Sequence, residues 1–484
     1  MSRLFLHRIR RLAVCGATAI ATTGAGLTGV AVSGAATGSL PAVMPALEDF
    51  QLLSSSVTPP SESDCFAVGR RCFTATAMEN SYNLPPLYAL GDKGQGVTIA
   101  IIDSFGNPNM ESDLANFDTQ MGLPHMCGEP GAACGSGIPT FQHMFWNGKT
   151  EVKEKPANAH DPGLQDRTAW TLETSLDVEW AHAIAPLANI VNITTNPAET
   201  QGVQGLPPMM DAEQFVVDTG QASVISQSFG AVEDGFNGAH ALQNLRHAFV
   251  SAAAAGVTVV ASSGDGGSAN SPKTPVKNPS NFPFPTVNWP ASDPLVTAVG
   301  GTYLCTNPVT GIGVDSTDPP ANCQNNPGVR EVGWIDSGGG FSHVFSAPAY
   351  QASLPAGSTA IGSMRGVPDV AWQASARTGT LVYDTAPGSG GWFIVGGTSA
   401  SAPQFSAMVA IADQIAGHGL GQINPTLYGL ASGPNYGSYF YDVTTGNNQA
   451  DPTVPGYPAT TGWDPVTGLG TPNAANLVPA LAAG

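Results

Sequence analysis

The sequence predicts an α/β domain built on a doubly wound, mostly parallel sheet with helices on both faces. The continuous apolar run 97–103 is typical of a strand that is buried on both faces. Further strand candidates alternate with helical stretches, which favours a parallel sheet with right-handed crossovers. Asp103, Ser228 and Asp265 each follow a predicted strand. Ligand sites in such sheets lie at the carboxyl ends of the strands.

The predicted elements follow one another along most of the chain. After 97–103, the strand candidates are 189–194, 223–227, 257–262, 295–299 and 392–395. The helical stretches are 168–184, 211–219, 238–255 and 405–415. The segments 263–293 and 305–345 are rich in Gly, Pro, Ser and Asn, so we expect long surface loops there.

Composition excludes some partners. Only 11% of the 484 residues are charged, and the formal net charge is −19. Four of the 17 basic residues lie in the first eleven positions, so the rest of the chain is still more acidic. Nucleic acid and anionic membrane surfaces are therefore not expected as partners. We expect a monomer, and the scarcity of Lys is consistent with acidic surroundings.

The N-terminus is typical of an export signal. A basic stretch is followed by a weakly apolar run, 12–32, and then by small residues that offer a cleavage site near Ala35 or Ala36. An uncleaved anchor is the alternative, although the Gly and Thr content makes the run a poor membrane span. We therefore predict a signal peptide over 1–36, a short linker or pro-segment over 37–71, a main domain over 72–484, and a secreted protein.

The cysteines predict disulfides. One of the seven, Cys15, lies inside the export signal, and six remain in the predicted exported chain. An even number in an exported chain favours disulfide pairing. Fifteen pairings are possible, and the simplest joins sequence neighbours: Cys65–Cys72, Cys127–Cys134 and Cys305–Cys323.

The stretch Val395–Pro403 places Ser399 between a strand with two glycines and a helical run. A serine at a helix N-terminus lies near unpaired N–H groups and the positive end of the helix dipole, which favour developing negative charge. A plain helix-capping serine is the alternative. The whole string Gly-Thr-Ser-x-Ser-x-Pro resembles the nucleophile segment of the subtilisin-like serine peptidases.

A serine nucleophile needs a base to take its proton. The subtilisin pattern has an aspartate after the first strand, where Asp103 fits, and a histidine in a His-Gly-Thr turn, which is missing here. His182 lies late in a predicted helix. The same helix carries Glu173 and Asp177, which are four residues apart and share a face. Such a pair favours sharing one proton, although a solvated helix face is the alternative.

Asp265 lies in Gly-Asp-Gly-Gly directly after the strand 257–262. In the subtilisin pattern this loop supplies an asparagine whose amide donates a hydrogen bond to the oxyanion. A carboxylate would repel an oxyanion, but a protonated acid can donate a hydrogen bond to it. Taken alone, the motif also fits a simple turn.

Together these residues resemble the sedolisin family of serine-carboxyl peptidases, over roughly residues 72–482. The resemblance implies a subtilisin-like fold and assigns a role to each of four residues: Ser399 as nucleophile, Glu173 as general base and acid, Asp177 as its orienting partner and Asp265 as the oxyanion-hole acid. Asp103 resembles an outer acidic residue of the same network. The strand 226–230 resembles the wall of the substrate cleft, with a buried sheet strand as the alternative.

The exchange of residues predicts an acidic optimum. A histidine base with a pKa near 6.5 is protonated at about pH 4, whereas a glutamate can still accept a proton there. An aspartic acid can keep its proton in the same range. The resemblance therefore implies a secreted endopeptidase that hydrolyses proteins or peptides at acidic pH.

The resemblance also implies a site for one calcium ion in the C-terminal region. The side chains of Asp442 and Asp464 and the carbonyl oxygens of Val443, Thr460 and Gly462 match the family's ligands. Oxygen ligands from ordered loops suit Ca²⁺. Thr460 stands where a glycine is more familiar, which matters little for a carbonyl ligand. Two turn-forming aspartates are the alternative.

Two other functions remain open at this point. One is a histidine-based subtilisin that uses Asp103, His182 and Ser399. The other is a catalytically silent, secreted binding protein. The sequence also departs from the family, since sedolisins usually carry a large pro-domain and only about 35 residues separate the predicted signal from the domain.

Overall fold

The computed structural model describes residues 44–45, 48–146, 151–152, 164–195, 205–270 and 282–484. All of them belong to one contact unit, Ser39–Gly484. The export signal predicted over 1–36, with Cys15 and the cleavage position near Ala35 and Ala36, lies outside the described residues and stays a prediction.

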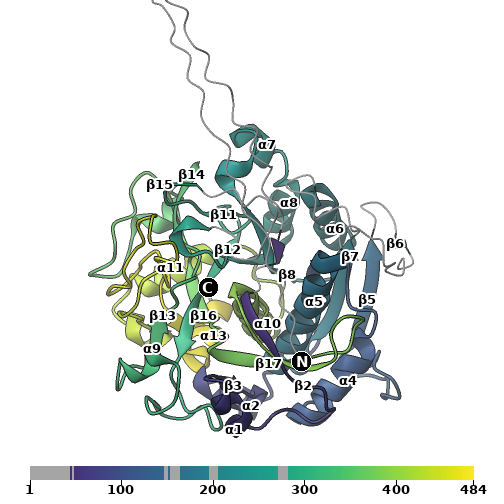
Figure 1. The fold of residues 1–484 in the computed structure, drawn as a ribbon. Coiled ribbons are helices and arrows are strands. Elements are labelled where there is room, and N and C mark those ends of the chain that lie inside the picture. Colours follow the sequence, from purple (N-terminus) through teal and green to yellow (C-terminus); the bar gives the residue numbers. More distant parts are fainter. Residues whose placement is uncertain (1–43, 46–47, 147–150, 153–163, 196–204, 271–281) are drawn as a thin grey trace, which may run out of the picture. The chain divides into compact units, whose positions relative to one another are not determined.

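A nine-stranded sheet forms the centre of the described structure (Figure 1). Its strand order is β13-β12-β10-β8-β4-β7-β5-β6, and β16 also pairs with β12. Every pairing is parallel except those of β13 and β6. The bounds are β4 Thr98–Ser104, β5 Phe141–Trp146, β6 Glu151–Val152, β7 Asn189–Thr195, β8 Val224–Gln227, β10 Thr258–Ser262, β12 Thr297–Leu304, β13 Glu331–Gly333 and β16 Val370–Gln373.

Helices cover both faces of this sheet, as the sequence predicted. Successive strand residues point to opposite faces, so each strand contributes to two cores. Ile99 and Ile101 of β4 belong to a core that includes residues of α5 and α10. Ala100 and Ile102 belong to a second core with residues of α6 and α8. The doubly wound α/β prediction is confirmed.

The helices range from short turns to five-turn segments. Their bounds are α1 Glu62–Ala67, α2 Ala75–Ser81, α3 Pro85–Leu90, α4 Met110–Met121, α5 Leu164–Ile184, α6 Leu206–Thr219, α7 Ala239–Gln243, α8 His247–Ala255, α9 Ala321–Gln324, α10 Thr398–Ala416, α11 Asn424–Ala431, α12 Tyr436–Tyr439 and α13 Ala474–Ala482. Within the described part of the chain, no helix has both the length and the apolar character needed to cross a membrane.

Four smaller sheets surround the central one. One consists of β1 Met44–Pro45, β9 Phe229–Val232 and β11 Asn288–Trp289. A second consists of β2 Glu48–Ser54, β18 Gly391–Gly396, β17 Thr378–Asp384 and β3 Arg71–Phe73. The other two are β14 Gly340–Ser346 with β15 Met364–Val367, and β19 Phe440–Tyr441 with β20 Thr471–Pro472.

Residues 48–71, which the sequence assigns to a linker or pro-segment, contribute elements to these sheets. β2 pairs antiparallel with β18, the strand that leads to Ser399, and β3 pairs parallel with β17. Three disulfides join sequence neighbours, which confirms the simplest pairing: Cys65–Cys72, Cys127–Cys134 and Cys305–Cys323.

The structure differs from the predicted elements in several places. The described parts of 263–293 and 305–345, expected to be long surface loops, contain β11, α9, β13 and most of β14, with buried residues such as Trp289 and Ser337. The predicted helix 238–255 is interrupted between α7 and α8. Strand β5 was missed, and it pairs parallel with β7. Helix α10 begins at Thr398 rather than at Phe405, and it includes Pro403. A proline in the first turns of a helix removes only one backbone hydrogen bond, so it is compatible with this earlier start.

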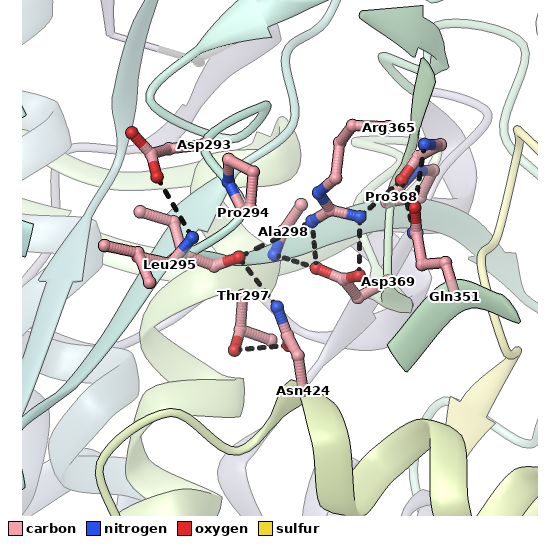
Figure 2. Close-up of polar contacts among 12 residues, drawn as sticks. Asp293, Pro294, Leu295, Thr297, Ala298, Gln351, Arg365, Pro368, Asp369 and Asn424 are labelled. Atoms are coloured by element: carbon pink, nitrogen blue, oxygen red, sulfur yellow. Dashed lines mark hydrogen bonds and ion pairs between the residues drawn. The ribbon is translucent and has the colours of Figure 1, made fainter. Parts of the chain in front are cut away.

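A buried ion pair joins several of these elements (Figure 2). Arg365 and Asp369 are both fully buried, and two guanidinium nitrogens donate to the two carboxylate oxygens at 2.8 and 2.6 Å. The Ala298 N–H donates to the same carboxylate at 2.8 Å, so the pair also fixes strand β12. Asn424 of α11 donates to the Val296 carbonyl at 2.9 Å.

Candidate active site

The site lies where the order of the central strands reverses. The chain adds β5 and β7 on one side of β4, and then β8, β10 and β12 on the other. The crevice between the carboxyl ends of β4 and β8 is the topological switch point, where ligand sites are expected in such sheets. Asp103 lies near the end of β4, and Ser228 follows β8 directly.

Ser399 is placed by a tight connection between β18 and α10. A Cβ atom on Gly396 would lie 2.1 Å from the Ala376 nitrogen, so only glycine allows this close approach. Gly397 has a φ of 123° and precedes the helix. Ser399 is the second helical residue and is fully buried. Its hydroxyl therefore lies at the positive end of a helix.

Helix α5 brings two carboxyl groups to this site. It packs beside α10 in the centre of Figure 1. Glu173 and Asp177 lie one turn apart on it, and both are fully buried. Within the described residues, no group makes a standard hydrogen bond to either Glu173 oxygen. The Ser399 hydroxyl is still close enough to favour the charged form of Glu173 and lower its pKa.

Ser228 connects the nucleophile to the second carboxyl group. The Ser399 Oγ donates a hydrogen bond to the Ser228 carbonyl at 3.2 Å. The Ser228 Oγ in turn donates to the Asp177 Oδ1 at 2.9 Å. In this conformation the Ser399 proton points to a backbone carbonyl, and rotation about the Cβ–Oγ bond would direct it to Glu173.

The carboxyl groups in the crevice resist ionisation. The pKa of Glu173 is raised well above its usual range, first by burial and then by the charge of Asp177. The pKa of Asp177 is raised by burial and by the charge of Asp103. Burial also raises the pKa of Asp103 to about 7, although a hydrogen bond from Asn192 at 2.8 Å opposes this effect. These groups hold protons rather than separate charges near neutrality.

Asp265 is held against the first turn of α10. Its Oδ1 accepts hydrogen bonds from the Thr398 N–H at 2.7 Å and from the Thr398 hydroxyl at 2.8 Å. The Gly264 N–H donates to the same hydroxyl at 2.9 Å. Because Oδ1 already accepts two hydrogen bonds, a proton on this acid would reside on Oδ2.

His182 lies elsewhere. Its Nε2 is 2.9 Å from the Pro124 carbonyl, which can only accept, and 3.3 Å from the Asp118 carboxylate. It follows Glu173 by nine residues on the same helix, which corresponds to about 13 Å along the axis. The geometry therefore gives no support to a triad of Asp103, His182 and Ser399.

The predicted calcium ligands lie together in the C-terminal region. Asp442 follows β19, and both of its carboxylate oxygens lie 3.1 Å from the Gly462 nitrogen, which donates to them. Asp464 is fully buried, and its Oδ2 accepts the Thr460 N–H at 2.9 Å. The two aspartates are thus tied to one loop.

These residues fit a hard cation. No described backbone N–H donates to the carbonyls of Val443, Thr460 or Gly462. Burial raises the pKa of Asp464 to about 7, and it raises the pKa of Asp442 as well. Two carboxylates without a cationic side chain and three carbonyls with free lone pairs form an oxygen ligand set of the kind that Ca²⁺ prefers.

Comparisons with known proteins point to one family and one fold. No protein-family model matches the sequence. Kumamolisin of Bacillus sp. (strain MN-32) is 32% identical over 419 residues, which are 84% of this chain and 63% of the relative. Sedolisin of Pseudomonas sp. (strain 101) is 33% identical over 279 residues, or 57% of this chain and 44% of the relative. The chain belongs to the sedolisin family.

Other sedolisin relatives extend the comparison. Human tripeptidyl-peptidase 1 is 31% identical over 371 residues, 72% of this chain and 57% of the relative. The solved structure of Pseudomonas sedolisin in complex with two molecules of pseudo-iodotyrostatin matches with a TM-score of 0.65 and 24% identity, over 86% of this chain and 99% of that one. This likeness shows the subtilisin-like fold. The chain spans between about two fifths and two thirds of the length of these curated relatives.

Some contacts of the site were not predicted from the sequence. Ser228 was noted as a strand end and as part of the stretch 226–230 that resembles the cleft wall, but its contacts with Ser399 and Asp177 were not predicted. Asn192 lies in the middle of β7 and contacts Asp103 across the sheet. A polar residue inside an apolar strand was the available hint. Thr398 precedes the nucleophile and positions Asp265.

Proposed function

We propose that this chain is a secreted serine-carboxyl endopeptidase that hydrolyses peptide bonds of proteins at acidic pH, with Ser399 as nucleophile. The supporting observation is the buried Ser399 hydroxyl beside Glu173, whose pKa responds to it. Carboxyl groups take the place of the imidazole at this site. The relatives named as peptidases give the proposal its reaction class.

In the proposed mechanism, Glu173 accepts the Ser399 proton as Oγ attacks the peptide carbonyl carbon. Asp177 shares a proton with Glu173 and holds it in place, and the Ser228 hydroxyl orients Asp177. The oxyanion receives hydrogen bonds from the protonated Asp265 and from the Ser399 N–H. Glu173 then returns the proton to the leaving amine, and water hydrolyses the acyl-enzyme by the same steps.

The raised pKa values are compatible with activity in acid, because the carboxyl groups titrate together. The first proton leaves the cluster more readily than the later ones, since each new charge repels the next. A single negative charge shared between Glu173 and Asp177 is enough to accept the serine proton. As the pH rises, further groups including Asp265 are expected to ionise. Asp265 can then no longer donate a hydrogen bond to the oxyanion.

Strand β9 offers an edge for an extended substrate. It begins one residue after Ser228, and β11 occupies its other edge. Peptides commonly bind such an edge as an added antiparallel strand. In the structure β1 holds this position, with Met44 opposite Gly230 and Pro45 opposite Phe229, and it contacts α5.

We therefore propose that the chain before β2 leaves this edge when substrate binds. This refines the predicted pro-segment 37–71: residues from Glu48 onward pair with β18, and we expect them to remain in the mature enzyme. A protein that begins at Glu48 is expected to be active without a lag, whereas the longer chain is expected to show one. Equal progress curves for both would exclude this role for β1.

We also propose one structural Ca²⁺, held by the side chains of Asp442 and Asp464 and the carbonyls of Val443, Thr460 and Gly462. A bound ion would supply the positive charge that these buried carboxylates lack and would tie β19 to the loop 460–464. The three disulfides support an exported, oxidised protein. The signal peptide over 1–36, with cleavage near Ala35 or Ala36, is part of this proposal.

The proposed function is tested with an unfolded protein substrate at pH 4. Parent, Ser399→Ala, Glu173→Ala and His182→Ala would be compared, and the products mapped to separate internal cleavage from release of tripeptides. We expect Ser399→Ala and Glu173→Ala to be inactive. The histidine-based alternative predicts loss in His182→Ala with Glu173→Ala still active. Absence of activity in the parent as well as in Ser399→Ala would instead favour a binding protein.

A further inference from the structure

A second group of metal-ligating side chains lies apart from both sites described above. It joins the last turn of α4, the loop closed by the Cys127–Cys134 disulfide and the last turns of α5. Asp118, His125 and Glu129 each direct one ligand atom here, and all three atoms lie within 4.8 Å of one another. Neither the peptidase mechanism nor the calcium site uses these residues.

The two carboxylates of this group are buried, and within the described residues only histidines form ion pairs with them. Asp118 is fully buried, and the His182 Nε2 lies 3.3 Å from its Oδ2. The Glu129 side chain is also buried, and it contacts the Met126 N–H and the His125 Nδ1. Burial and then the neighbouring Asp118 raise the pKa of Glu129 to about 7. Two buried carboxyl groups at this separation require a proton or a cation between them.

His182 offers a counter-charge to only one of the two carboxylates. His182 lies 3.3 Å from Asp118 through its Nε2, but the same nitrogen donates to the Pro124 carbonyl at 2.9 Å. It therefore orients the Asp118 carboxylate from outside the group. Within the described residues, no lysine or arginine forms an ion pair with Asp118 or Glu129.

His125 completes the arrangement. Its side chain is 47% exposed, so an ion can reach the buried carboxylates from solvent along it. Its Nδ1 faces Glu129, and its Nε2 lies 3.4 Å from the Thr119 hydroxyl. An outer hydrogen bond of this kind fixes the ring of a metal-binding histidine, so the Nδ1 that faces Glu129 is the nitrogen that would bind the metal.

We propose that Asp118, His125 and Glu129 bind a divalent transition-metal ion such as Zn²⁺. One imidazole nitrogen and two carboxylate oxygens are typical zinc ligands, and water would complete a four-coordinate site. The imidazole favours such an ion over Ca²⁺, whose ligands are oxygens. The bound ion would fasten the disulfide loop to α4. Its ligand Asp118 contacts His182 near the end of α5, the helix that carries Glu173 and Asp177. This inference is independent of the proposed peptidase function.

The test measures zinc bound by the full-length chain in a Ser399→Ala background, which prevents self-cleavage. The protein is stripped with chelator, returned to excess Ca²⁺ at pH 7, given Zn²⁺ and desalted. We expect one equivalent of zinc per chain, and a higher melting temperature than the stripped protein shows in Ca²⁺ alone. Co²⁺ in place of Zn²⁺ should give visible absorption bands from a site with a nitrogen ligand.

Matched histidine variants make the result specific. His125→Ala removes an exposed side chain, so the fold is expected to survive, and zinc affinity should fall by more than the ~10- to 100-fold typical of losing an outer hydrogen-bond partner. His240→Ala, an exposed histidine on α7, should retain the full equivalent. The proposal is overturned if the parent retains no zinc, or if His125→Ala retains as much as His240→Ala.

Discussion

Two regions of this protein bury carboxylates completely but treat their charge in opposite ways. At Asp369, Arg365 donates to both oxygens, and the Ala298 N–H donates as well (Figure 2). The Tyr428 hydroxyl also donates to this carboxylate. At Glu173 and Asp177, no lysine or arginine within the described residues forms an ion pair with either carboxyl group. The first region pairs its carboxylate with a buried cation, and the second provides no such cation, so its carboxyl groups favour the protonated form.

The difference separates a structural site from a chemical one. A buried carboxylate that is fully hydrogen-bonded to arginine has no reason to exchange a proton, and it fixes the strands around it. In a buried carboxyl group without a cation, the protonated and ionised forms can be close in free energy, so that the group readily gains and loses a proton. A general base requires this property. The fold thus stabilises a negative charge beside β12 and β16 with an arginine, whereas the carboxyl groups at the crevice between β4 and β8 have no such partner.

Among substitutions in these two regions, we expect the largest effect from Glu173, and we expect it on activity. Glu173→Gln keeps the shape of the side chain but removes the base, so kcat/KM should fall by on the order of 10⁴-fold or more. The fold should persist, because no ion pair is lost. Activity at pH 4 and the melting temperature of the same preparations check both statements.

The same variant has a defined effect on stability against pH. The folded-state pKa of Glu173 lies above its unfolded value, so the parent loses stability as the pH rises from the unfolded pKa through the folded one. Glu173→Gln cannot lose that proton. It should therefore become more stable than the parent as the pH rises from 4 toward 7. If the parent instead became more stable relative to the variant as the pH rises over this range, the direction of the pKa shift would be contradicted.

The opposite response is expected at the ion pair. Asp369→Asn leaves the buried Arg365 charge without its partner, so the free energy of unfolding should fall by about 3–5 kcal/mol. Urea denaturation at pH 5 measures this. The double variant Arg365→Met with Asp369→Asn removes both charges and should lose less than Asp369→Asn alone. A loss that is no smaller in the double variant would mean that the unpaired charge is not the cause.

Calcium removal tests a third way of stabilising buried carboxylates, in which a metal ion supplies the positive charge. With a bound ion at 100 times its dissociation constant, chelation should lower the free energy of unfolding by about 2.7 kcal/mol. Melting curves with and without chelator measure this, in excess Ca²⁺ as reference. Asp464→Asn should melt at a low temperature that no longer responds to chelator. An unchanged parent melting temperature on chelation would remove the calcium ion from the account.

The smallest effect concerns orientation. Ser228→Ala removes the hydrogen bond to Asp177 but no reacting group, so kcat/KM should fall roughly 10-fold. Because the Ser228 hydroxyl lowers the pKa of Asp177, the acid limb of the pH profile should move to higher pH. Ser228→Thr keeps a hydroxyl and should recover much of the rate. An unshifted limb in Ser228→Ala would leave Ser228 with a packing role alone.

The local parts of the site could be predicted from the sequence. Ser399 follows a Gly-Gly turn at a helix start, and the spacing of Glu173 and Asp177 on one helix face needs only helical periodicity. The buried carboxyl environment could not be read in the same way, because Asn192, Ser228 and Thr398 reach the acids across strands and between elements far apart in the chain.

The same limit applies to the fold. Apolar runs and their alternation predicted β4, β7, β8 and β10 to within a residue or two. The pairing of β1 with β9 and the ion pair of Arg365 with Asp369 depend on tertiary contacts that no local pattern encodes. Helix α10 starts before Pro403 because packing against α5 outweighs the loss of one hydrogen bond.

The central claim is that shared protons among Glu173, Asp177 and Asp265 activate Ser399. The most direct measurement is kcat/KM of the mature parent on a peptide substrate from pH 2.5 to 8. The account predicts a bell-shaped profile with its maximum below pH 6 and little activity at pH 8. A profile that rises through pH 7 and stays high would require an imidazole-type base, and it would contradict the assignment of Glu173.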